Sequence, residues 1–150
     1  MKTLLIAFVS FFASLGLAAQ CPNLAGKYQQ VFPQETGAIL QVIQNVDQVL
    51  HLSFSGYQTP RRIWTLVLTG KPHPKNLGAS YRDVIEQSYC KDNQVYSILS
   101  GRLLVGNRIV SFVEKWTIYK NTSGELVWQK RSRDDTGKGP RLDIYKYSSR

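Results

Sequence analysis

Apolar side chains recur at alternate positions along most of the chain after residue 20. Leu50, Leu52 and Phe54 alternate with polar residues, and Trp64, Leu66 and Leu68 repeat the pattern. Such alternation is typical of strands, because successive strand residues point to opposite faces, whereas a helix repeats its apolar positions every three or four residues. Clusters of turn-forming residues separate the runs and divide the chain into about eight to nine predicted strands. Only the segment 76–86 carries a weak alternative, a short helix.

Short turns between consecutive strands indicate an antiparallel meander, because parallel neighbours need long crossover connections. A meander with one apolar face must close on itself or pack as a sandwich to cover that face and its edges. We therefore predict an all-β fold: an antiparallel up-and-down meander that closes into a barrel, with residues 20–150 as a single domain.

The hairpin around residues 121–124 allows a specific prediction of register. If same-face residues pair across it, Trp116 lies opposite Trp128, and Glu114 lies opposite Lys130 among apolar neighbours. A carboxylate there would be costly without a partner, so the two charges are expected to pair. Two interpretations stay open: a structural ion pair at the barrel end, or a polar group inside a binding cavity.

The first nineteen residues have the three regions of a signal peptide. Lys2 provides the basic start, an uncharged apolar run follows, and small residues end at Ala19. We expect residues 1–19 to be removed and the mature protein to be secreted or periplasmic. The mature chain has no transmembrane span of its own in this prediction, because the apolar run lies within the removed part.

Two cysteines and an excess of basic residues complete the picture. Export leads to an oxidising compartment, so Cys21 and Cys90 are predicted to form a disulfide. Two cysteines and two histidines without close spacing make a metal site unexpected. Without Lys2, 18 Lys and Arg face 10 Asp and Glu, a formal charge of +8 that favours anionic partners. Asn121 begins a glycosylation sequon, which matters only in a eukaryotic secretory route.

The mature N-terminus resembles the start of a known family. Gly26, Lys27 and Tyr28 are similar to the Gly-x-Trp signature that opens the barrel of lipocalins and related calycins, with Tyr28 in the place of Trp. The resemblance implies an eight-stranded barrel with a cup for a small, mostly apolar molecule. It also implies that Tyr28 packs under a cation from the last strand, for which Arg141, or else Lys146, is the matching position.

These observations predict a non-catalytic protein that holds a small apolar or amphipathic ligand in its barrel. The predicted ligand-binding residues are Tyr28, Trp64, Phe112, Glu114, Trp116, Trp128 and Lys130. The alternative is an interaction or inhibitor protein that binds an anionic envelope component or an acidic protein through Arg131, Arg133, Lys138 and Arg141. No catalytic motif, cofactor or nucleic-acid partner is expected, because neither histidine has a nucleophile and an orienting acid nearby in the sequence.

Overall fold

The computed structural model describes residues 21–33, 38–45, 48–56, 62–136 and 139–150. The predicted signal peptide, residues 1–19, lies outside these ranges. Ten strands make up the described chain: β1 (Gly26–Phe32), β2 (Ile39–Asn45), β3 (Val49–Ser55), β4 (Arg62–Val67), β5 (His73–Pro74), β6 (Tyr81–Lys91), β7 (Gln94–Val105), β8 (Arg108–Lys120), β9 (Leu126–Asp134) and β10 (Arg141–Ser149). The described residues contain no helix, so the helical alternative for residues 76–86 is wrong and β6 begins within that segment.

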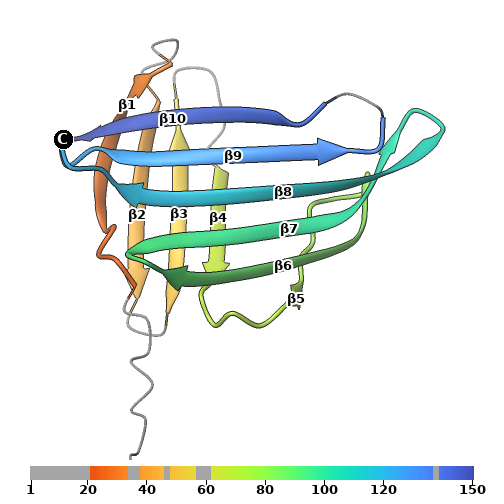
Figure 1. Cartoon of the computed structure of the whole chain (residues 1–150), viewed down its shortest axis with the longest axis horizontal. Coiled ribbons are helices and arrows are strands. Elements are labelled where there is room, and N and C mark those ends of the chain that lie inside the picture. Colours follow the sequence, from red (N-terminus) through yellow and green to blue (C-terminus); the bar gives the residue numbers. More distant parts are fainter. Residues whose placement is uncertain (1–20, 34–37, 46–47, 57–61, 137–138) are drawn as a thin grey trace, which may run out of the picture.

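All ten strands belong to one antiparallel sheet with the order β4-β3-β2-β1-β10-β9-β8-β7-β6-β5. The predicted antiparallel meander is therefore confirmed. In Figure 1, β1–β4 run nearly at right angles to β6–β10, which lie in front of them, and the sheet turns from one layer to the other between β1 and β10. The fold is thus two crossed layers of one bent sheet, the arrangement of orthogonal β packing.

The sheet does not close through hydrogen bonds, so the predicted closed barrel is not confirmed. β4 and β5 are the two ends of the ladder. The connection from β4 to β5 crosses the opening instead, and its Gly70 N–H donates to Ser88 O of β6 at 2.8 Å. We call this junction between β4 and β6 the seam.

The core lies between the two layers. Leu40, Leu50, Leu52 and Leu66 from β2–β4 are fully buried, and Trp116 and Ile118 of β8 pack in the same cluster. Burying one such aliphatic side chain stabilises the fold by about 1.5–3 kcal/mol. The predicted alternation therefore produces one apolar face, which the bent sheet covers with itself.

Two local features shape the layer formed by β6–β10. Asp92 and Asn93 both have positive φ angles, 50° and 58°, and form the two-residue turn between β6 and β7. This turn chemistry matches the right-handed twist of a hairpin. The register of β6 against β7 shifts between Arg82 and Ile85. Gly101 lies at that irregularity, where a Cβ atom would be 3.0 Å from the Val84 Cα.

Cys21 and Cys90 form the predicted disulfide, which joins the N-terminal segment to the end of β6 across a sequence separation of 69 residues. The bond indicates an oxidising compartment, extracellular or periplasmic. No helix in the described part of the chain is long and apolar enough to cross a membrane.

Candidate functional site

A cavity of about 320 Å³ opens at one end of the space between the layers. Its wall comes from five strands, whose inward positions meet there because the layers cross. Its lining residues are Phe54, Arg62, Trp64, Trp116, Trp128, Lys130, Tyr145 and Tyr147. The volume lies at the small end of the range of ligand pockets, about 300–1,000 Å³.

All three tryptophans of the chain line this cavity. The ring centroids of Trp64 and Trp116 are 4.7 Å apart, and those of Trp116 and Trp128 are 5.0 Å apart. Phe54 extends the row, with its centroid 5.0 Å from that of Trp128. These tilted and edge-on geometries are the favoured ones for aromatic pairs. The cavity therefore has a continuous aromatic wall that links β3 and β4 to β8 and β9.

An ion pair lies beside this wall. Lys130 Nζ is 2.9 Å from Glu114 Oε1, and Trp116 Nε1 donates to Glu114 Oε2 at 3.3 Å. The two charged side chains are 30% and 22% exposed, which leaves the pair at the mouth rather than in the dry core. The predicted pairing of these charges is confirmed, and Glu114 thereby holds both the lysine and one indole in place.

The predicted register of this hairpin is wrong by two residues. Trp116 pairs with Lys130 rather than with Trp128, and Ile118 pairs with Trp128. Asn121 explains the shift, because its Oδ1 accepts the N–H groups of Ser123 and Glu125 and so lengthens the loop. A shift of two residues keeps every side chain on its predicted face, and Glu114 reaches Lys130 as a diagonal neighbour.

Several polar groups of the cavity have no protein partner in the described part of the chain. Nε1 of Trp64 and Nε1 of Trp128 are buried without a hydrogen-bond acceptor. Buried indole N–H groups usually have a partner, and an unsatisfied one costs about 1–3 kcal/mol. Arg62 is exposed at the rim and forms no ion pair among the described residues. Of these groups, the exposed Arg62 remains accessible to an acceptor that enters the cavity, whereas the two indole N–H groups are enclosed by protein atoms.

Other predicted binding residues lie elsewhere. Tyr28 is 2% exposed and does not line the cavity; its hydroxyl donates to Leu24 O at 2.8 Å. Phe112 packs in a separate cluster, 5.7 Å from the ring of Tyr81. These aromatics fill the core rather than the cavity wall.

The residue predicted to cover Tyr28 is also different. Arg141 forms an ion pair with Asp143 at the start of β10, whereas Tyr28 pairs with Ser149 near the strand's end. Lys146 pairs with Phe32, so neither proposed cation is in register with Tyr28. The cation over the Tyr28 ring is Lys120, 5.9 Å from the ring centroid. The prediction for Arg141 and Lys146 is wrong because it assumed a family register.

No protein-family model matches the chain, and no curated protein matches it. The resemblance to lipocalins therefore stays a prediction.

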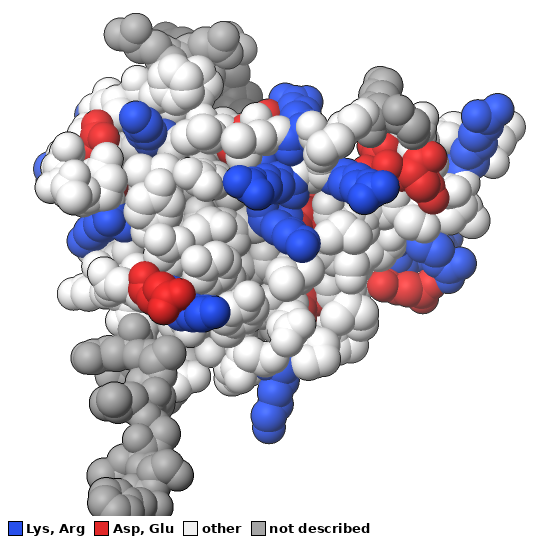
Figure 2. Space-filling model, in the orientation of Figure 1, with Lys and Arg blue, Asp and Glu red and all other residues white. Residues whose placement is uncertain are grey.

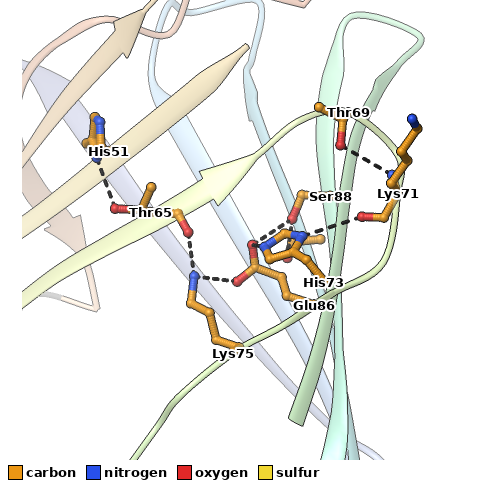
Figure 3. Close-up of polar contacts among 9 residues, drawn as sticks. His51, Thr65, Thr69, Lys71, His73, Lys75, Glu86 and Ser88 are labelled. Atoms are coloured by element: carbon orange, nitrogen blue, oxygen red, sulfur yellow. Dashed lines mark hydrogen bonds and ion pairs between the residues drawn. The ribbon is translucent and has the colours of Figure 1, made fainter. Parts of the chain in front are cut away.

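A second group of polar side chains lies at the seam (Figure 3). Glu86 is fully buried, and its Oε2 is 2.6 Å from Lys75 Nζ. Lys75 Nζ also donates to the backbone oxygen of Thr65 on β4, and His73 Nε2 is 3.5 Å from Glu86 Oε1. Ser88 Oγ donates to the same carboxylate at 3.3 Å. We call Glu86, Lys75, His73 and Ser88 the seam cluster; it ties β6 to β4 where the ladder is interrupted.

Most of the seam cluster is enclosed by protein. Glu86 and Ser88 of the cluster and the neighbouring Ser97 are 0–2% exposed, whereas the side chains of His73 and Lys75 are 29% and 19% exposed. Ser88 Oγ donates to Glu86 and is also 2.9 Å from Ser97 Oγ, so its hydrogen bonds lie within the interior. Within the described residues, no group of three metal-ligating side chains is found.

The residues predicted to bind an anionic surface do not lie together. Arg131 and Arg133 are exposed on the outer face of β9. Arg141 points to the other face of the sheet and is paired with Asp143. Lys138 lies outside the described residues. The outer face also carries Lys115, directly opposite Arg131.

Sequence reasoning identified half of the cavity wall, and alternation was the signal that found it. It missed Phe54, Arg62, Tyr145 and Tyr147, which line the same cavity. Alternation placed Phe54 on the apolar face, but only the crossing angle of the layers brings β3 and β10 to the mouth. Lys75 and Glu86 carried no sequence signal, because a charged residue in a strand or loop is ordinarily exposed.

Proposed function

We propose that the protein is an exported, non-catalytic binding protein that holds a small amphipathic ligand in the cavity, in a lipocalin-like barrel. One observation carries the proposal: an open, mostly aromatic cavity of about 320 Å³ that contains every tryptophan of the chain. Pockets with apolar walls and a few placed polar groups are the usual form of small-molecule sites.

The polar groups favour an amphipathic ligand over a purely apolar one. Arg62 and Lys130 lie at the mouth and place two cations beside the aromatic wall. Glu114 neutralises Lys130, which leaves Arg62 as the excess charge. The ligand accordingly has an apolar body against the tryptophans and an oxygen-bearing, neutral or anionic head.

The experiment compares ligands that share one acyl chain and differ in the head group: a fatty acid, the alcohol and the amine. Isothermal titration calorimetry of the mature protein should show binding of the acid and the alcohol in preference to the amine, with one ligand per protein. If none of the three binds with a dissociation constant below about 1 mM, which is about −4 kcal/mol, the proposal fails.

Two variants test whether the ligand binds in the cavity. Phe54→Ala removes an aromatic wall of the cavity, and Ile63→Ala removes an apolar side chain that is 60% exposed on the outer surface of the next strand. Losing the contact area of Phe54 should weaken binding about tenfold or more, the effect of about 1.5–3 kcal/mol of apolar burial. Equal weakening by both variants would place the ligand outside the cavity.

A further inference from the structure

A groove of about 390 Å³ lies on the outer face of the layer formed by β6–β10, on the opposite side of the sheet from the cavity. It crosses β6–β9 and is lined by two adjacent cross-strand rows. One row joins Tyr96, Thr117 and Gln129, and the next joins Ile98, Lys115 and Arg131. Tyr89 and Gln94 complete the side nearest β6. We call this the outer groove.

Two cations face each other in the outer groove. Lys115 and Arg131 are directly opposite in the β8–β9 ladder, both exposed, and neither forms an ion pair with a described carboxylate. Like charges in directly opposite positions destabilise a sheet. Arg133 lies on the same face, two residues along β9. Figure 2 looks onto this face and shows Lys and Arg side chains gathered over its middle. Repulsion between these cations destabilises the fold, and a bound anion would relieve that repulsion.

The groove also has a fixed aromatic edge. The rings of Tyr89 and Tyr96 stack with centroids 5.4 Å apart and an interplanar angle of 15°. The Tyr96 hydroxyl donates to Gln94 Oε1 at 3.0 Å, which orients the ring and the amide together. Gln129 is held in the same way, because its Nε2 donates to the Tyr119 hydroxyl at 3.2 Å. Such side chains lose little freedom when a ligand binds.

From this combination we infer that the outer groove binds an acidic saccharide, with the carboxylate or sulfate groups on Lys115 and Arg131 and a sugar ring against the tyrosines. Arginine and lysine form charge-assisted hydrogen bonds with such oxyanions. The tyrosines present an apolar face with a polar edge, and the amides of Gln94 and Gln129 match sugar hydroxyl groups. The groove shares no cation with the cavity, so this inference stands independently of the proposed function.

Binding is measured by calorimetry with three oligosaccharides of equal length: a heparin-derived fragment, an oligogalacturonate and a neutral dextran fragment. The two acidic probes should bind and the dextran should not, and binding should weaken as salt rises. Equal binding of the dextran fragment would overturn the inference.

Two double variants carry the same loss of charge. Lys115→Gln with Arg131→Gln should weaken acidic-saccharide binding about tenfold or more, because two charge-assisted contacts are lost. The control, Lys27→Gln with Arg108→Gln, alters exposed cations outside the groove and should change binding less than about threefold. Equal losses would show that only net charge matters, and the inference would be wrong.

Three further measurements distinguish the possible outcomes. The groove variant should melt at the same or a higher temperature than the wild type, since it removes a like-charge pair; a lower melting temperature would contradict the premise. Tyr96→Leu should weaken saccharide binding severalfold, and unchanged binding would remove the stacking contact from the inference. Tighter binding to phosphatidylglycerol vesicles than to either acidic saccharide would assign the groove to a membrane surface and overturn the saccharide.

Discussion

Lys75 is the residue whose removal tests the account of the seam most sharply. Its ammonium group lies 2.6 Å from the carboxylate of Glu86, donates to the backbone of β4, and is 5.2 Å from the ring centroid of Trp64. The single substitution Lys75→Met keeps the length of the side chain and removes the charge. Glu86 then remains fully buried without its cation.

The expected cost follows from that burial. Breaking a buried pair by removing one partner costs about 3–5 kcal/mol, because the remaining charge is uncompensated. Ser88 and His73 stay beside Glu86 and offset part of the loss. We therefore expect about 3 kcal/mol, near the low end of that range, or a fall in melting temperature of about 10 °C for a domain of this size.

Urea denaturation followed by circular dichroism measures this loss. Lys71→Met is the matched control, since Lys71 is exposed in the same connection and its side chain makes no ion pair with a described residue. The double variant Lys75→Met with Glu86→Leu should recover most of the lost stability, because an apolar pair of similar volume can replace a buried ion pair. If Lys75→Met costs no more than about 0.5 kcal/mol beyond the control, the ordinary effect of a surface substitution, the reasoning is refuted.

Three other predictions concern stability. Burial raises the pKa of Tyr147 well above its usual value, so stability should fall above about pH 10, where only the unfolded chain loses this proton, by up to about 1.4 kcal/mol per pH unit, and Tyr147→Phe should flatten that fall in urea denaturation curves. Gly101→Ala should cost about 1–3 kcal/mol in the same assay, because the added methyl group meets the β6 backbone at 3.0 Å. Replacing Cys21 and Cys90 by serine should cost about 4 kcal/mol, the chain-entropy value for a loop closed by a 69-residue separation.

Each of these has a matched control. Tyr89→Phe alters a tyrosine on the outer face and is the control for the substitution itself; parallel curves for both tyrosine variants would contradict the assignment. Gly139→Ala adds a methyl group where no atom lies within 4 Å, so it should cost less than Gly101→Ala. Dithiothreitol should reproduce the effect of the serine substitutions in the wild type. Unaltered stability on reduction would mean that the disulfide does not constrain the unfolded chain.

The apolar face was predictable because alternation fixes side-chain direction residue by residue. Trp64, Trp116 and Trp128 all have the inward orientation that the pattern assigned to them. The exact register was not predictable, because Asn121 sets it through hydrogen bonds that its side chain makes in the loop. Local periodicity determines which face a residue occupies, while loop chemistry determines which residue it meets.

How the opening between β4 and β6 is bridged depended on contacts between residues distant in sequence. The seam is bridged by a connection that contributes Gly70 and Lys75, whose roles arise only when β4 and β6 approach each other. The role expected for Arg141 failed for the same reason, since it came from a family register that β10 does not share. The alternation of apolar residues therefore predicted the meander and its apolar face, whereas contacts between residues distant in sequence determine where the sheet ends.

The location of a bound ligand tests the central claim most directly, and the chain supplies its own probe. Because all three tryptophans line the cavity, a bromine-substituted fatty acid bound there should quench most of the intrinsic fluorescence at saturation. Saturable binding of the same probe with the emission undiminished would contradict the account, because the ligand would then lie away from Trp64, Trp116 and Trp128.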